Sequence, residues 1–140
     1  MAVAQAYRRV LGRGMARTTT EVIHDHLSRR LGGDVEGDIE SNFSPDIIIL
    51  SGFATYRGHQ GIRESAKALA EATSGGTFSY NRTVIEGPYG FLEWTASAED
   101  TKISDGADSF VVHDGLIVFQ SIHYTAWPVG HDADASASSR

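Results

Sequence analysis

Residues 105–124 read DGADSFVVHDGLIVFQSIHY, and this stretch decides the predicted fold. Two runs rich in β-branched and aromatic residues flank the turn signal HDG at 113–115, a pattern typical of a β-hairpin. Side chains alternate between the two faces of a strand, so Asp108 shares its face with Phe110 and Val112. The stretch therefore predicts an antiparallel pair of strands with a carboxylate on its apolar face.

Strand patterns continue outward from this hairpin. Residues 77–86 and 91–99 are bounded by turn signals, and together with 103–112 and 116–126 they predict an antiparallel meander. Further upstream, the short apolar run DIIILSG at 46–52 predicts one more strand, buried on both faces.

Helical periodicity is found in the segments before this meander. TTTEVIHDHLSRRL at 18–31 opens with a capping-box spacing and repeats apolar residues four apart, which predicts a helix. A short second helix is expected from the N-cap Asp34 to just before Pro45, and a longer third from about 60 to 73. This order indicates an α+β fold in which three helices cover one face of a strongly curved, mainly antiparallel sheet.

Composition limits the classes of function. The chain has 140 residues, the size of one domain, with 41% apolar residues and a net charge of −6. The body of the domain has no basic stripe, and no apolar run approaches the roughly 20 residues of a spanning helix, so we expect neither a nucleic-acid partner nor a membrane. The chain has no cysteine, which excludes disulfides and a thiolate nucleophile, and the expected location is cytoplasmic.

Both ends of the chain differ from this body. Residues 1–17 carry several arginines and are expected to form a flexible arm, or to come from an upstream start with Met15 as the real beginning. Residues 128–140 are low in apolar residues and are expected to be a disordered tail. The predicted domain is therefore 18–127.

Three motifs carry a resemblance to a known family. YRGHQGIRES at 56–65, FLEW at 91–94 and DGADSFVVHDGLI at 105–117, in this order of elements, resemble the SnoaL-like and NTF2-like superfamily across roughly 18–127. The resemblance implies a cone-shaped α+β barrel that encloses an apolar pocket, often in a dimer across the outer face of the sheet. It implies a fold rather than an activity, because this fold hosts isomerases, cyclases, epoxide hydrolases, dehydratases and non-catalytic binding domains.

The branches of the superfamily can be compared residue by residue. Similarity to ketosteroid isomerases puts His26 where that branch has an oxyanion-hole Tyr, and Asp108 where it has a protonated Asp. The general-base position falls on Ser51, which cannot take a proton near neutral pH, so steroid isomerisation by that mechanism is not expected. The epoxide hydrolase triad is not matched, since Glu93 and His123 stand in its place. The polyketide cyclase branch implies a single pocket Asp as acid and base, a role that Asp108 could fill with His26.

Asp108 and His26 have a physical case as an acid/base pair. A carboxyl group in an apolar cavity has its pKa raised by desolvation, and an imidazole ordinarily titrates near neutrality, so both could exchange protons with a carbonyl compound. The competing interpretations are an exposed or bulge-bound Asp108 and a structural His26 at the edge of the buried stripe. The pocket interpretation predicts that Asp108 is buried and has a raised pKa.

Strand 91–99 can face the pocket in either of two registers. The more apolar alternate set contains Trp94, and we choose it. The opposite register would turn Glu93 towards Asp108, and the two like charges would raise one carboxyl pKa further.

The loop at 113–115 decides which side chains of the following strand share the face of Asp108. A three-residue loop pairs Asp108 with Gln120 and puts Tyr124 on the same face. A two-residue turn would shift the pairing by one residue and bring His123 round instead. We predict the three-residue loop, because it agrees with the resemblance. The side chains expected to line the pocket are Tyr56, Trp94, Phe110, Gln120, Ile122 and Tyr124.

These observations predict a SnoaL-like protein with a pocket for an apolar small molecule. If it is an enzyme, Asp108 and His26 would perform cofactor-independent acid/base chemistry of the isomerase, cyclase or dehydratase type on a carbonyl compound. The alternative is a non-catalytic ligand-binding or protein-assembly domain. No metal site is expected, since the six histidines are scattered without ligand spacing, and a homodimer through the outer sheet face is the expected assembly.

Overall fold

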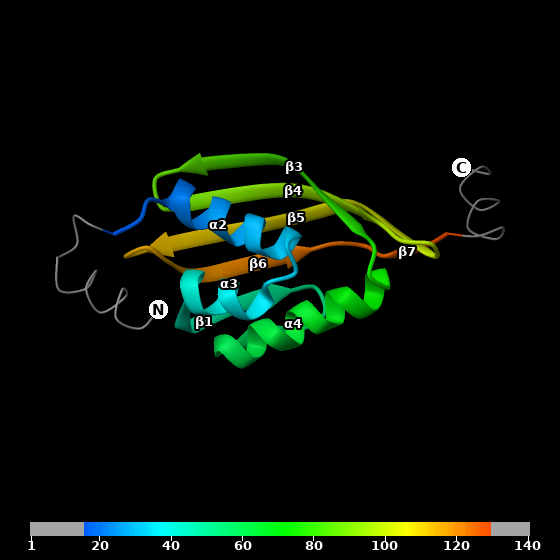
Figure 1. The fold of residues 1–140 in the computed structure, drawn as a ribbon, viewed down its shortest axis with the longest axis horizontal. Coiled ribbons are helices and arrows are strands. Elements are labelled where there is room, and N and C mark those ends of the chain that lie inside the picture. The colour runs from blue at the N-terminus through cyan, green and yellow to red at the C-terminus, as the bar shows by residue number, and fades with distance from the viewer. Residues whose placement is uncertain (1–15, 130–140) are drawn as a thin grey trace.

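The computed structural model describes residues 16–129, whose path is drawn in Figure 1. In chain order the elements are α2 (Thr19–Leu31), α3 (Val35–Asn42), β1 (Phe43–Ser51), β2 (Thr55–Arg57), α4 (Gly58–Thr73), β3 (Thr77–Glu86), β4 (Tyr89–Ser97), β5 (Thr101–His113), β6 (Leu116–His123) and β7 (Trp127–Pro128). The strands form one sheet in the order β2-β1-β6-β5-β4-β3, and β7 pairs with β5. Neighbouring strands are antiparallel except β1 and β6, which are parallel. The predicted α+β class is confirmed.

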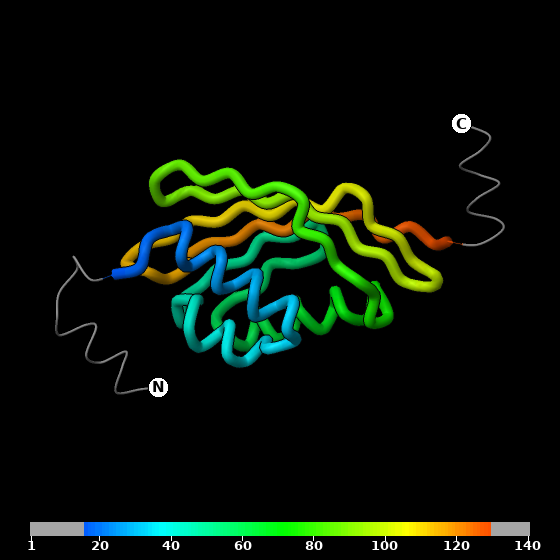
Figure 2. The backbone as a smooth tube through the Cα atoms, turned by 45° about the horizontal axis from the view of Figure 1, so that its top comes forward, coloured from blue at the N-terminus to red at the C-terminus, as the bar shows by residue number. Residues whose placement is uncertain are grey.

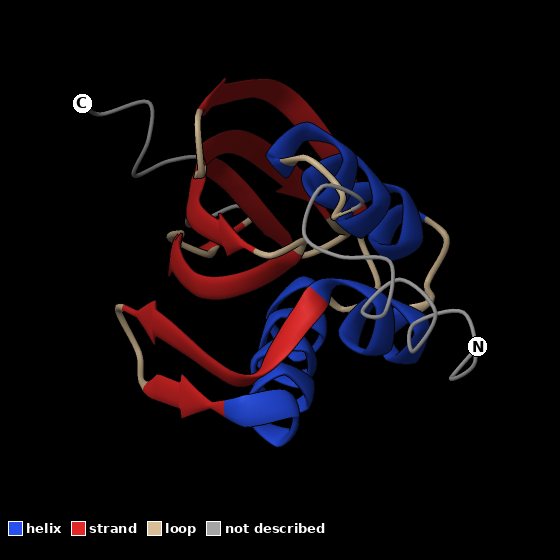
Figure 3. Cartoon of the chain, turned by 90° about the vertical axis from the view of Figure 1, so that its left-hand side faces the viewer, coloured by secondary structure: helices blue, strands red, loops and turns tan. Residues whose placement is uncertain are grey.

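The sheet is strongly curved (Figure 3). It is also open, because its edge strands β2 and β3 do not pair with each other. Figure 1 shows the three helices on one face of it, and Figure 3 shows the strands curling around that face when the molecule is seen from its end. Figure 2 follows the meander from β3 to β6, whose strands run side by side along the molecule. The fold is therefore a cone with an open side and not a closed barrel.

The first helix begins where the capping box predicts. The Thr18 side chain accepts a hydrogen bond from the Glu21 backbone N–H at 3.1 Å, and Oε1 of Glu21 accepts one from the Thr18 N–H at 3.0 Å. Asp34 caps α3 in the same way, by accepting from the Gly37 N–H at 3.0 Å. These caps set where α2 and α3 begin, and therefore which of their side chains face the sheet.

The core lies between the helices and the concave face of the sheet. In β4, Trp94 is buried and Glu93 is exposed, so the predicted register of this strand is confirmed. Side chains at intervals of two residues along the strands meet the apolar stripes of the helices. The buried apolar residues are Val22, Ile23, Leu27, Ile39, Phe43, Ile47, Ile49, Ile62, Leu92, Trp94, Ala96, Ile103, Phe110, Val112 and Ile117.

The prediction of a three-residue hairpin loop was wrong. His113 pairs with Leu116, which leaves a two-residue turn, and both turn residues have positive φ, 49° at Asp114 and 75° at Gly115. An Asp-Gly dipeptide suits this turn because its mirror-image backbone matches the twist of the flanking strands.

The shorter turn was expected to bring His123 onto the face of Asp108. This does not happen, because a bulge in β6 shifts the pairing by one further residue. Between Val111 and Val112 the register shifts by one residue, so Asp108 pairs with Ile122 and not with Gln120 as predicted. Gln120 and Ile122 remain on the face of Asp108, and His123 remains on the outer face as predicted, where Nε2 lies 3.3 Å from the Asp105 carboxylate.

The prediction that the first strand is buried on both faces was also wrong. In β1, Ile47 and Ile49 are buried, whereas Leu50 is 45% exposed. The helices cover one face of the sheet only, so even a continuous apolar run has a covered and an uncovered side. The strand β2, which pairs with β1, was not predicted.

The ordered domain extends past the predicted boundaries. Arg17 was assigned to the flexible arm, but its guanidinium donates hydrogen bonds to Asn42 at 2.9 Å and to the carbonyl of Gly115 at 2.9 Å. Pro128 belongs to β7, and the Val129 N–H donates to the Asp100 carbonyl. Residues 1–15 of the predicted arm and 130–140 of the predicted tail lie outside the described residues. No helix within 16–129 has the length and apolar character needed to cross a membrane.

Candidate functional site

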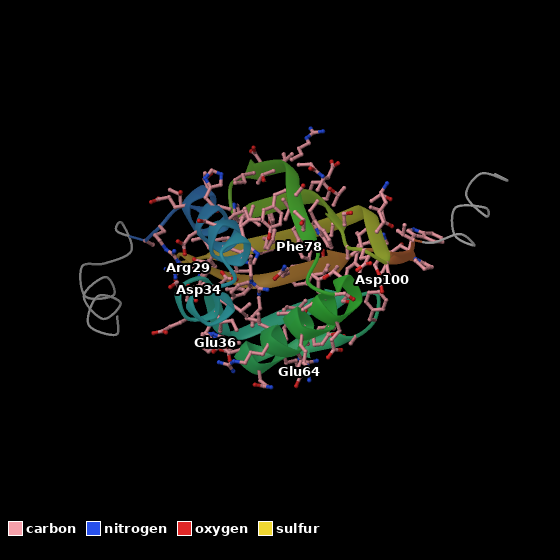
Figure 4. The ribbon with its side chains drawn as sticks, turned by 45° about the vertical axis from the view of Figure 1, so that its right-hand side comes forward. Arg29, Asp34, Glu36, Glu64, Phe78 and Asp100 are labelled. Atoms are coloured by element: carbon pink, nitrogen blue, oxygen red, sulfur yellow. The ribbon has the colours of Figure 1, made fainter. Side chains whose placement is uncertain are left out.

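A cavity of about 220 Å³ lies between the helices and the concave face of the sheet. Most of its wall is apolar, formed by side chains such as Val35, Leu69, Phe78 and Leu92. In Figure 4, Phe78 lies over the middle of the molecule, whereas Glu64 lies at its periphery. The polar side chains that line the cavity are His26, Arg30, Ser65, Tyr80, Asp108 and Gln120.

Asp108 is buried in the middle of β5, as predicted. Its Oδ1 accepts a hydrogen bond from Nε1 of Trp94 at 2.9 Å, and its Oδ2 accepts one from Nε2 of Gln120 at 3.1 Å. Burial raises the pKa of Asp108 to about 6, although the hydrogen bond from Trp94 and the charge of His26 oppose the rise. A carboxyl group with this pKa can hold or release a proton close to neutral pH.

A glycine makes the Trp94 contact possible. Gly106 lies directly opposite Trp94 in the β4–β5 pair, and a Cβ atom at this position would overlap the indole ring. The ring therefore lies flat over Gly106 and directs its N–H to Asp108, two residues further along the same strand. In this way β4 and β5 together define the position of the carboxylate.

His26 faces the sheet from α2, and its ring is held on three sides. The ring packs edge-on against Phe43 and Phe110, with centroid distances of 5.3 Å and 5.5 Å. Its Nδ1 lies 2.7 Å from Oδ2 of Asp38. Among residues 16–129, no group hydrogen-bonds to Nε2, and every fully buried side-chain nitrogen or oxygen there has a partner, so Nε2 is open to the cavity.

Asp38 is fully buried and is a functional candidate that the sequence analysis missed. Besides His26, it accepts a hydrogen bond from Nε of Arg30 at 2.6 Å and one from Nδ2 of Asn42 at 2.9 Å. Burial alone would raise the pKa of Asp38, but the charges and hydrogen bonds of His26 and Arg30 outweigh it, and the pKa is lowered. An ionised Asp38 keeps the proton of the imidazole on Nδ1 and leaves Nε2 as an acceptor.

A sequence signal for Asp38 did exist. Asp38 and Asn42 are four residues apart, next to the apolar stripe of the short helix α3, so two polar side chains share the inward side of one helix. Tyr80 was also missed: it is half-buried on β3 and lines the cavity, and burial raises its pKa to about 12. Its hydroxyl group therefore remains protonated and can donate a hydrogen bond.

The predicted site residues fall into two groups. His26, Trp94, Asp108, Gln120 and Ile122 all line the one cavity. The other predicted wall residues do not line it, which corrects the prediction; they are Tyr56, Phe110 and Tyr124.

Each of these three side chains packs against other residues of the domain. Phe110 is buried beneath the ring of His26, and Tyr124 packs against Trp94 with a centroid distance of 5.8 Å. Tyr56 belongs to β2 and packs against the core beside Gly61. Two side chains on the same face of a sheet can lie at different depths under the helices, which strand alternation does not reveal.

Within 16–129, no group of three or more His, Asp or Glu side chains is arranged to hold a metal ion. The polar groups that line the cavity are instead one carboxyl group, an imidazole, a guanidinium, a phenol, a hydroxyl and an amide, and the Asp38 carboxylate lies behind the imidazole. This set can move protons and bind oxygen atoms.

The SnoaL-like domain family matches residues 23–120, which include both His26 and Asp108. The chain belongs to this family. No curated protein matches it. The SnoaL-like domain superposes with a TM-score of 0.65 on a protein from Kribbella flavida that is provisionally assigned as a ketosteroid isomerase, at 16% identity over 79% of this chain and 82% of that one.

Two other solved structures show that likeness in fold does not identify the activity. A protein from Sinorhizobium meliloti, provisionally assigned as a polyketide cyclase, matches at 17% identity and a TM-score of 0.61, over 73% of this chain and 93% of that one. A de novo designed protein with a curved β-sheet matches at 15% identity and a TM-score of 0.64, over 76% and 84%. At these identities the likeness concerns the fold alone, so the activity must be argued from the cavity.

Proposed function

We propose that this SnoaL-like domain binds a small carbonyl compound in the cavity and catalyses an acid/base reaction of the isomerase, cyclase or dehydratase type, without a cofactor. One observation carries the proposal. An imidazole held by a buried carboxylate and a carboxyl group with a raised pKa face the same apolar cavity. Groups that exchange protons near neutral pH are what proton abstraction next to a carbonyl group requires.

In this mechanism His26 is the base and Asp108 is the acid. Nε2 of His26 takes a proton from the carbon next to the carbonyl group, and the protonated Asp108 donates its proton to the carbonyl oxygen, which yields an enol. Asp38 accepts the Nδ1 hydrogen bond throughout and stabilises the imidazolium that forms, as the Asp of a Ser-His-Asp triad does. The enol can then be protonated at another carbon, lose a leaving group or attack a second carbonyl group.

The names of two relatives agree with chemistry of this kind. Polyketide cyclisation and ketosteroid isomerisation both proceed through enols or enolates, and proteins provisionally assigned to each share this fold. The contribution of each proton-transfer group is expected to be about 10²- to 10⁴-fold in rate.

The test uses a simple ketone as the probe. The full chain is incubated with 2-tetralone in D₂O, and exchange of the protons next to the carbonyl is followed by proton NMR. We expect exchange faster than in buffer, and a loss of about 100-fold or more in His26→Gln and in Asp108→Asn. His24→Gln is the matched control, because His24 is an exposed histidine on the same helix.

Binding is measured beside exchange, through the fluorescence of Trp94 in a Trp127→Phe background that leaves one indole in the chain. Saturable binding with no exchange above the buffer rate would refute the catalytic proposal and favour the alternative, a non-catalytic ligand-binding domain. Exchange that survives both substitutions would refute the assigned residues.

We further propose a homodimer through the outer face of the sheet. Val84 and Phe91 are a cross-strand pair on β3 and β4, and they are 44% and 38% exposed on the side away from the helices. With Tyr89, also exposed, they form an apolar patch of the kind that marks protein contacts.

A further inference from the structure

We infer that the cavity takes an anionic ligand: an apolar ring compound that carries an ionised carboxylate or enol oxygen, which Arg30 binds. This inference names the substrate class of the site described above and so rests on the proposed function. Its test measures binding without turnover, so the two can fail separately.

Arg30 has more donors than the protein uses. Its Nε donates to Asp38 at 2.6 Å, and among residues 16–129 Asp38 is the one hydrogen-bond acceptor of this guanidinium. A guanidinium has five N–H donors, which leaves four on the terminal nitrogens. The side chain is only 20% exposed and lines the cavity, so these donors lie at the edge of the site and not in open solvent.

The neighbouring arginine shows what a purely structural arginine looks like in this helix. Arg29 donates to Asp25 at 2.8 Å and to Asp34 at 2.8 Å, outside the cavity. Figure 4 shows Arg29 and Asp34 together at the surface. Either arginine would satisfy the preference for a cation in the last turn of α2, so that preference does not explain why Arg30 is directed inward.

Tyr80 supplies a second donor in the same cavity, because its hydroxyl group remains protonated. Tyr80, Arg30 and Asp108 line the same cavity, and the charges of Arg30 and Asp108 both act on the phenol, so it is near both groups. An anionic oxygen is attracted to Arg30 and Tyr80 and repelled by an ionised Asp108. The ligand is thereby oriented, with its anion near Arg30 and its reacting carbonyl group near Asp108.

The charge balance of the site also favours an anion. Asp38 carries one negative charge, and Arg30 one positive charge. While Asp108 holds its proton, protonation of His26 makes the charged groups of the site positive together, and an ionised ligand oxygen balances that charge. The apolar wall and the volume of about 220 Å³ suit a compound of one or two fused rings.

The experiment compares probes of one shape and different charge. Isothermal titration calorimetry of the full chain at pH 5.5, below the pKa of Asp108, uses 2-naphthoate and its neutral analogue 2-acetylnaphthalene. A third probe, 2-hydroxy-1,4-naphthoquinone, is ionised at its enol oxygen and tests that source of the anion against the carboxylate. We expect both anions to bind at least about 10-fold more tightly than the neutral ketone.

Substitution of the arginine separates binding from folding. Arg30→Gln should lose about 10- to 100-fold in affinity for the anions, with less than about twofold change for 2-acetylnaphthalene, because a hydrogen bond to a charged group is lost. Arg30→Lys should keep part of the preference, since it keeps the charge without the fork of donors. Arg29→Gln, the matched control, should leave all three affinities unchanged.

Equal affinity for charged and neutral probes, no binding of either anion at millimolar concentration, or an unchanged preference in Arg30→Gln would each overturn the inference. A preference for anions in a protein that does not exchange protons of 2-tetralone would uphold it and refute the proposed reaction instead.

Discussion

The buried carboxylate of Asp108 should make the stability of this domain depend on pH in a particular direction. Its pKa in the folded chain is about 6, against 3.8 for an ordinary aspartate. Between these two values the folded state binds more protons than the unfolded state, so the contribution of Asp108 to stability is full below about pH 4 and is lost as the pH rises towards 6. At 1.36 kcal/mol per pKa unit, the loss amounts to about 3 kcal/mol.

The perturbation that isolates this effect is Asp108→Asn, which keeps the shape of the side chain and removes its charge. We expect the variant to be more stable than the wild type at pH 8 by up to about 3 kcal/mol, and the difference to vanish near pH 4. The carbonyl oxygen of the amide can still accept from Trp94, and the Gln120 side chain can turn its own amide to match.

The assay is urea denaturation of both proteins at several pH values, with Asp46→Asn as the control because Asp46 is exposed on β1. Comparison of the two proteins at each pH cancels the titration of other groups, including Asp38, whose lowered pKa acts in the opposite direction. The measured quantity is the free energy of unfolding of the variant minus that of the wild type. If this difference is the same at every pH, or if it falls from pH 4 to pH 8, the reasoning is refuted.

Three further predictions concern other parts of the molecule. Gly106→Ala should destabilise the domain by about 1–3 kcal/mol, because the new methyl group overlaps the indole of Trp94; an unchanged urea midpoint would contradict this packing. Asp38→Asn should lower 2-tetralone exchange by at least about 100-fold while 2-acetylnaphthalene still binds, since His26 loses the acceptor that orients it; exchange at the wild-type rate would remove Asp38 from the mechanism. Val84→Asp should convert the proposed dimer into a monomer in light scattering, whereas a monomeric wild type would end the dimer proposal.

Local patterns were sufficient to predict most of the architecture. The capping box of α2, the N-cap of α3 and the helical stripe of α4 all lie where the sequence places them, within a few residues. These features depend on interactions between residues a few positions apart, so they can be predicted from the local sequence. The same holds for the alternation that buries Trp94 and exposes Glu93.

The hairpin at 113–116 shows where prediction from the local sequence stops. The predicted loop was wrong by one residue, but a bulge in β6 compensates, so Ile122 still shares the face of Asp108. The bulge lies in a strand that pairs with both β5 and the parallel strand β1. Pairing with two strands at once depends on the tertiary structure, so the local sequence of β6 does not predict the bulge.

The sequence by itself therefore determined the fold class and put Asp108 on the apolar face of its strand, because both follow from periodicity along the elements, whereas the pocket position of His26 was predicted from the resemblance. Only the tertiary structure decided the chemistry around them. Asp38 meets His26 and Arg30 because α3 packs against α2, and Arg30 lines the cavity although Arg29 beside it does not. Hydrogen bonds between elements depend on angles and depths of packing, and distances across a fold cannot be read from spacing along the chain.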